Sequence, residues 1–239
     1  MLKITGISPK MVHIRTHFCI FISGLTSLTA LTYMTQQNRV LIIDLLSRVF
    51  MDNPRVLRTV RDGDKEKRLR IMTEYAYDLV SKHDGVFLSS DQSTAMLYYR
   101  KKGFRKDLYD LYRYARMFLL CIKPLKAPEI QKRENHIESL RLQGIDYIYV
   151  WLLGHNPEVR GLRGLAEIRD HLDRESARLN LPILIETTVE RNLKLYRYVG
   201  FEIYHHWYDE KEDLNVWFLK RSVDVALRNL EKAANSLPG

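Results

Sequence analysis

Residues 145–153, IDYIYVWLL, are the most constraining segment of the chain, because Asp146 alone interrupts a run of apolar and aromatic side chains. A strand with one face in water alternates apolar and polar residues, whereas a strand covered on both faces reads as a nearly continuous apolar run. We therefore predict a central strand at this position. The chain is then expected to fold as an α/β protein with layers packed on both faces of a sheet.

Hydrophobic periodicity on either side of this run predicts further elements. The spacing of apolar residues predicts helices at 38–50, 65–81, 107–122, 161–179, 190–199 and 223–237. Short segments rich in β-branched and aromatic residues predict strands at 85–89, 95–100, 182–188, 201–207 and 214–219. Residues 128–141 are compatible with a polar helix or a loop, and Asp52-Asn53-Pro54 reads as a turn that ends the first helix.

Composition narrows the class of protein. The chain has 239 residues, 46% of them hydrophobic, which is enough for one domain with a full core. Its formal net charge of +9 suits an anionic partner, but positive residues are scattered among acidic ones, so nucleic acid is disfavoured.

Cys19 and Cys121 are too few for a disulfide framework, so we expect a reducing, cytoplasmic compartment.

The N-terminal stretch 18–34, FCIFISGLTSLTALTYM, is apolar apart from one glycine and small hydroxyl residues, and it follows Lys3, Lys10 and Arg15. That outline resembles a signal peptide or a marginal membrane anchor. It is short for a membrane span and has no convincing cleavage site, so translation from Met34 is an equal alternative. We expect a leader at 1–37, a domain at 38–222 and a C-terminal helix at 223–239, with membrane association only if residues 18–34 are retained.

The predicted central strand passes through residues 154–159 into the glycine-containing segment 160–165, which opens the next predicted helix. Free backbone N–H groups and the positive end of the helix dipole make such a turn favourable for a pyrophosphate. Turns of this kind are common, and this one alone predicts only a connection between a strand and a helix.

The residues that follow make the signal more specific. The strand LIETT at 184–188 precedes Asn192, Tyr196 and Gly200-Phe201. Together with Pro157, Glu158, Arg160 and Gly161, they resemble the cofactor half of GNAT-superfamily N-acetyltransferases. Members of that superfamily often have an apolar strand, a Pro-Glu-x-Arg/Gln-Gly turn, a helix, a Leu-Glu-Thr strand, an Asn, a Tyr four residues later and Gly-Phe four residues after that. The close match covers residues 152–201.

This resemblance implies an α/β (α+β) fold with a mixed, mostly antiparallel central sheet, flanked by helices and splayed at the cofactor-binding strand. It implies that acetyl-CoA is the cofactor and that its acetyl group passes directly to a primary amine of a small molecule or peptide in a ternary complex. The amine should bind opposite the cofactor, between the first two helices and the last strand pair. A non-catalytic coenzyme A binding or sensing protein of the same fold is the alternative.

The resemblance also assigns roles to individual residues. Backbone amides of the turn would hold the pyrophosphate, from Arg160, Gly161, Leu162, Arg163, Gly164 and Leu165. The strand edge at Leu153, Gly154 and His155 would pair with the pantetheine arm, and Asn192 would donate a hydrogen bond to it. Tyr196 would contact the cofactor and give a proton to the departing thiolate.

The general base is less clearly marked. Glu186 is the predicted base, with His155, His205 and His206 as open alternatives. No metal is expected, because no Cys/His ligand spacing is present and the adjacent His205 and His206 point to opposite faces of a strand.

The turn also departs from the family pattern, which is usually Arg/Gln-x-x-Gly-x-Gly/Ala. Anchoring the pattern on Arg160 puts Arg163 and Leu165 where two small residues belong, whereas a shift by one puts Gly164 and Ala166 there and Gly161 at the Arg/Gln position. We favour the first register. A Cβ then takes up space beside the pyrophosphate, and Arg163 either pairs with a phosphate or blocks the turn.

Overall fold

A computed structural model describes residues 36–235 of the chain. The chain divides into two compact units, residues 1–40 and 41–239. In the first unit the described residues, 36–40, are helical. The apolar stretch 18–34, the alternative start at Met34 and the last residues of the predicted C-terminal helix lie outside the described residues. The predicted domain limits at 38 and 222 stay a prediction.

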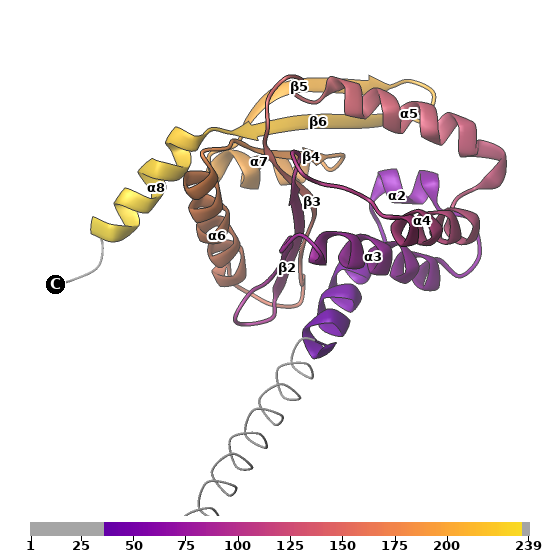
Figure 1. The fold of residues 1–239 in the computed structure, drawn as a ribbon, viewed down its shortest axis with the longest axis horizontal. Coiled ribbons are helices and arrows are strands. Elements are labelled where there is room, and N and C mark those ends of the chain that lie inside the picture. Colours follow the sequence, from indigo (N-terminus) through magenta and orange to yellow (C-terminus); the bar gives the residue numbers. More distant parts are fainter. Residues whose placement is uncertain (1–35, 236–239) are drawn as a thin grey trace, which may run out of the picture. The chain divides into compact units, whose positions relative to one another are not determined.

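A mixed sheet forms the centre of the second unit (Figure 1). Within residues 36–235 it has six strands in the order β1-β2-β3-β4-β6-β5. The strands are β1 Val86–Leu88, β2 Thr94–Arg100, β3 Ile148–His155, β4 Ile183–Thr187, β5 Glu202–Asp209 and β6 Leu214–Arg221. Neighbouring strands are antiparallel except β3 and β4, which are parallel. The predicted mixed, mostly antiparallel sheet is confirmed.

Helices cover both faces of this sheet (Figure 1). A first helix, residues 36–49, is followed by α2 Pro54–Thr59, α3 Lys65–Ser81, α4 Leu108–Cys121, the short 3₁₀ helix η1 Pro124–Lys126, α5 Ala127–Leu140, α6 Arg163–Leu179, α7 Arg191–Tyr198 and α8 Val223–Asn235. The helices α6 and α7 pack on one face, which we call the α6 face. Residues 42–46 of the first helix, α3 and α5 pack on the other, which we call the α3 face.

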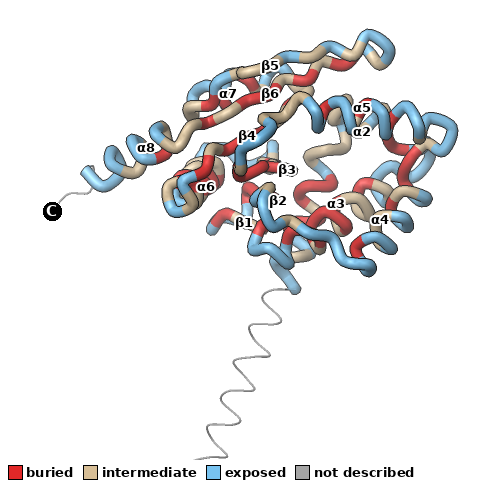
Figure 2. Tube along the Cα trace, turned by 45° about the horizontal axis from the view of Figure 1, so that its top comes forward, coloured by how far each residue is buried: buried red, intermediate tan, exposed pale blue. Residues whose placement is uncertain are grey.

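Alternation along the strands explains why both faces are apolar. On β4, Ile183 and Ile185 pack with Ile168 and Leu172 of α6. Leu184, between them, points to the opposite face and packs with Tyr149 of β3 and the preceding Tyr147. Buried segments accordingly follow β3 and β4 and the inner side of α3 (Figure 2). The nearly continuous apolar run therefore supplies both layers of the core, as predicted.

Local polar residues set the helix ends. Asp107 accepts a hydrogen bond from Asp110 N, and Asp110 accepts one from Asp107 N, which forms a capping box at the start of α4. At the C-terminal end of α6, the C-cap residue Asn180 adopts a left-handed conformation with φ 53°. The predicted limits of α3, residues 65 and 81, agree with the structure.

Two local predictions, the turn at 52–54 and the limits of the central strand, differ from the structure, and of the two alternatives for residues 128–141 the helix is confirmed. Asn53 caps a further helix, α2, because its side chain accepts from Arg55 N and Val56 N and Pro54 occupies the first turn, where it is tolerated. Residues 127–140 form a helix, α5, whose buried Ile130 and Ile137 lie two turns apart. The central strand occupies 148–155 instead of 145–153, because β2 offers partners only from Thr94 to Arg100.

None of the helices within residues 36–235 has both the length and the apolar content needed to cross a bilayer.

Candidate functional site

The sheet opens between its two parallel strands. The ladder joining β3 and β4 contains three residue pairs, and the last is Val150 with Ile185. Beyond it β3 continues along β2 to His155, while β4 continues along β6 to Thr187. The β4-facing edge of β3 therefore has no strand partner in the described chain from Trp151 onward, and its backbone groups are free to pair with a ligand. The predicted splay at this strand is confirmed.

A mostly apolar cavity lies on the α6 face of this opening. Its volume is about 430 Å³ and includes open solvent. Val150 and Ile185, the last paired residues, lie at its base, and Leu153 lines it from the free part of β3. The helix α6 contributes Leu165, Ile168, Arg169 and Leu172, and α7 contributes Leu195 and Tyr196. Val199 and Phe201, which follow α7, and Arg221 at the end of β6 complete the lining.

The loop from Asn156 to Leu162 brings the chain from β3 to the start of α6. Leu162, the N-cap residue, makes no side-chain hydrogen bond to the helix. Because the first N–H groups of a helix have no intrahelical partner, an uncapped end presents donors and a positive dipole to a ligand. Gly161 has φ 114°, and no atom lies within 4 Å of the position that its Cβ would occupy. We call residues 160–165 the cradle.

Arg163 does not fill the cradle. Its side chain is 76% exposed and pairs with Glu167 one turn along α6, with 3.2 Å between Nε and Oε1. Glu167 also accepts hydrogen bonds from Ser90 N and Ser90 Oγ, so that it is tied to the β1-β2 turn. The blockage considered for Arg163 is absent.

Gly164 carries the close contact between the cradle and the sheet. A Cβ at this position would lie 2.3 Å from Thr94 Oγ1 and 2.5 Å from Ser93 Oγ. Those hydroxyls are buried and fixed by neighbours, since Ser93 Oγ donates to Asp91 and Thr94 Oγ1 bonds His155 Nδ1. The steric need for a small residue thus lies at Gly164, the position that the shifted register of the family pattern would choose.

Tyr196 is the polar side chain that α7 places against the cavity. It is 8% exposed, and its ring lies 5.9 Å from the ring of Phe201. Burial raises the pKa of its phenol to about 12. Asn192, one turn earlier, is half-buried and makes no hydrogen bond through its side chain to any residue between 36 and 235, but it is not among the residues that line the cavity.

Glu186 lies on the α3 face, opposite Tyr196. It follows the last β3-β4 pair by one residue, and its side chain is 5% exposed. Arg141 Nε donates to one carboxylate oxygen at 2.5 Å, and Arg55 Nη1 donates to the other at 3.2 Å. Arg55 also pairs with Glu134 of α5. The predicted base is therefore held by two arginines at the point where the strands separate.

This network has further members that residue spacing could not identify. Arg141 also donates to Tyr149 Oη at 2.9 Å and lies over that ring. Burial opposes the charge of Glu134, but the guanidinium of Arg55 lowers the pKa of this carboxyl below its ordinary value. Arg55, Glu134 and Glu186 come from α2, α5 and β4, so no local pattern in the sequence relates them.

The three histidines considered as bases differ in position. His155 ends β3 with both ring nitrogens engaged, by Thr94 Oγ1 at 2.8 Å and by the carbonyl of Val159 at 3.3 Å. His206 bonds Asn215 Oδ1 at 2.9 Å on the edge hairpin, and His205 packs on Phe218. Within residues 36–235 no group of His, Cys, Asp or Glu is arranged to hold a metal ion.

Comparison with known proteins gives a likeness of fold. No protein-family model matches the sequence, and no curated protein sequence matches it either. A solved structure described as histone acetyltransferase HPA2 and related acetyltransferase, from Corynebacterium glutamicum, is 18% identical with a TM-score of 0.55, over 78% of this chain and 92% of that one. The C-terminal condensation domain of Ebony, solved in complex with beta-alanyl-dopamine, is 10% identical with a TM-score of 0.52, over 77% of this chain and 94% of that one. The chain thus has the GNAT fold.

Proposed function

We propose that this chain, which has the GNAT fold, is an acetyl-CoA-dependent N-acetyltransferase that acts on a primary amine of a small molecule or peptide. One observation carries the proposal: the opening between β3 and β4 leads from the uncapped start of α6 to the buried phenol of Tyr196. The acetyltransferase described for the structure from Corynebacterium glutamicum supports the same activity.

The residues around the opening fit such a cofactor. Amides of the cradle, residues 160–165, would hold the pyrophosphate, since no side chain caps the helix there and Gly161 leaves open space. Backbone groups at Leu153, Gly154 and His155 would pair with the pantetheine arm, because this edge of β3 has no strand partner among the described residues. Asn192, whose amide is unused, would bond the same arm. Acetyl-CoA would supply the acetyl group as a thioester.

Two residues would then serve the transfer from opposite faces of the sheet. Tyr196 would donate its phenol proton to the sulfur that leaves when the acetyl group passes from the thioester to the amine nitrogen. With a pKa of about 12, Tyr196 stays protonated and able to donate at neutral pH. Glu186, on the α3 face, would accept the proton that the amine loses, directly or through water.

The second candidate is a non-catalytic coenzyme A binding or sensing protein. It is favoured by Glu186, because Arg141 and Arg55 already occupy its two carboxylate oxygens. Both candidates predict that coenzyme A binds at the cradle.

Calorimetry with acetyl-CoA, followed by a thiol-release assay with a broad panel of amines, separates them. We expect binding and acceptor-dependent thiol release. Binding without release for any amine would support the second candidate, and no binding would exclude both. Leu162→Glu, which puts a carboxylate at the exposed N-cap, should weaken binding about tenfold by repelling the pyrophosphate, while the control Tyr198→Glu on the exposed side of α7 should not.

A further inference from the structure

The outer side of α4 is an apolar surface that no element within residues 36–235 covers. Among the exposed positions of this helix, Leu108 is 85% exposed and Leu119 is 70% exposed. These two residues share one side of the helix with Leu111, Tyr112 and Ala115, at spacings of three and four residues. We call these five residues the α4 outer face. Exposed segments follow α4 in Figure 2.

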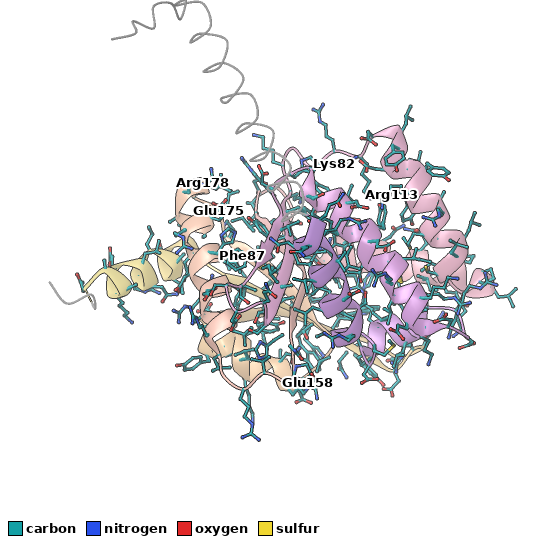
Figure 3. All side chains as sticks on the ribbon, turned by 90° about the horizontal axis from the view of Figure 1, so that it is seen from below. Lys82, Phe87, Arg113, Glu158, Glu175 and Arg178 are labelled. Carbon is teal, nitrogen blue, oxygen red and sulfur yellow. The ribbon has the colours of Figure 1, made fainter. Side chains whose placement is uncertain are left out.

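This exposure does not come from a loosely placed helix. The opposite side of α4 buries Met117 and Cys121 against Tyr75 and Leu79 of α3. Ion pairs hold the two helices together, from Lys82 to Asp110 at 2.7 Å and from Arg113 to Asp78, and Figure 3 shows Lys82 and Arg113 where α3 meets α4. A surface helix of a globular protein normally has one apolar side, whereas this one has two.

The charged residues in and beside α4 are mostly positive. The exposed positions of α4 contain one charged residue, Arg116, and no acid. Arg105 and Lys106 lie just before the helix, and Arg61 reaches its end by donating to the carbonyl of Leu119 at 3.2 Å. The exposed acid nearest in sequence, Asp107, is bound to Lys82 at 2.8 Å. An apolar strip with a cationic margin matches the interface of an anionic bilayer.

We propose that the α4 outer face binds the surface of an anionic phospholipid membrane, with its leucines in the acyl boundary and the arginines that flank it at the phosphates. A second copy of the chain fits less well, because a symmetric contact would bring Arg116 and its neighbours against the same positive margin. The apolar residues 18–34 have no acid to meet that margin either.

Flotation of the full chain with phosphatidylcholine vesicles, with and without phosphatidylglycerol, tests the proposal. We expect binding only to the anionic vesicles, and weaker binding at high salt. Arg116→Glu should lower the affinity about fivefold or more, since each basic residue near such a surface contributes that much. Leu119→Glu should lower it about tenfold or more, because a charge replaces a buried leucine.

Matched controls on α8 are Arg228→Glu and Leu227→Glu, both at exposed positions, which should change the affinity by about twofold at most. Circular dichroism checks that each variant folds. The proposal is overturned if the chain does not bind vesicles or if it binds neutral and anionic vesicles equally. It is also overturned if the α4 variants bind like the wild type, which is the result expected if residues 18–34 bind the membrane instead. A dimer that Leu119→Glu dissociates, without vesicle binding, would assign the surface to a second copy instead.

Discussion

Tyr196 shows how a single position combines a structural and a chemical role. Its ring belongs to the core on the α6 face, yet it also lines the cavity at the separation of β3 and β4. Burial raises the pKa of its phenol to about 12, so the phenol carries its proton at neutral pH.

Tyr196→Phe should lower kcat by about a hundredfold or more, because general acid catalysis typically contributes that much. The affinity for coenzyme A should stay nearly constant, since the ring remains. The measurement is thiol release beside calorimetry, with Tyr198→Phe, two residues along the same helix and 81% exposed, as the matched control. An equal kcat in the two variants would remove Tyr196 from the mechanism.

The variant Glu186→Gln tests whether Glu186 acts as the general base or only holds Arg55 and Arg141 in place. If Glu186 accepts the proton of the amine, the variant should be slow at neutral pH and recover as the pH approaches the pKa of the acceptor amine, because a neutral amine needs no base. The readout is kcat/KM against pH for both proteins. A defect that is constant with pH, together with a lower melting temperature, would mean that Glu186 only anchors Arg55 and Arg141.

At the scale of elements, the start of α6 is positioned by its contact with β2. The hydroxyls of Ser93 and Thr94 occupy the space that a side chain at position 164 would need. The cradle and the β1-β2 hairpin are therefore one packed unit, although they lie far apart in sequence.

Gly164→Ala should destabilise the fold by about 1–3 kcal/mol through overpacking, even though alanine favours a helix more than glycine does. The displaced helix start should also weaken coenzyme A binding. Urea unfolding and calorimetry measure the two effects. Gly144→Ala is the control, since φ is 76° there and no atom lies within 4 Å, so it reports backbone strain without crowding. A Gly164→Ala protein as stable as wild type would contradict the contact.

A second link joins β6, α6 and α8. Arg221 Nη2 lies 2.6 Å from Asp173 Oδ1, both side chains are 1% exposed, and Asn229 Nδ2 donates to Asp173 at 3.0 Å. Burial raises the pKa of Asp173 and lowers that of Arg221, against the attraction of the pair. Removing one charge leaves the other buried and unpaired.

Asp173→Asn should therefore cost about 3–5 kcal/mol in the free energy of unfolding. Arg178→Gln, which breaks the exposed pair with Glu175, is the control and should cost less than about 1 kcal/mol. Similar midpoints of urea unfolding for the two variants would show that the buried pair is not important for stability.

At the scale of the whole molecule, several tyrosines have a pKa that burial raises by a similar amount. Burial raises the pKa of Tyr75, Tyr98, Tyr99 and Tyr196 to about 12 each. In an unfolded chain a tyrosine has a pKa of about 10. Below that pH both states are protonated, and above it the unfolded state loses its protons first.

Stability should therefore be constant up to about pH 10 with respect to these groups and fall between about pH 10 and 12. The loss is about 1.4 kcal/mol per pKa unit of each group. Urea unfolding at stepped pH measures it, and absorbance at 295 nm should show part of the tyrosines ionising only on unfolding. Complete ionisation near pH 10 in the folded protein would contradict the prediction.

Sequence patterns determined the elements and most of their order. The run at 145–153 implied a strand covered on both faces, and β3 is buried in that way, with limits shifted by the length of β2. Apolar spacing placed α3 and α4. The spacing of Glu186, Asn192 and Tyr196 predicts a site on β4 and α7, and their roles stay a prediction.

Tertiary structure alone decided what these residues meet. The separation of β3 from β4 depends on β6, which pairs with β4 all along its length. The engagement of Glu186 by Arg55 and Arg141, and the hydroxyls beneath Gly164, join segments distant in the chain. Such contacts have no period or spacing in the sequence, because they arise only when separately folded elements pack together.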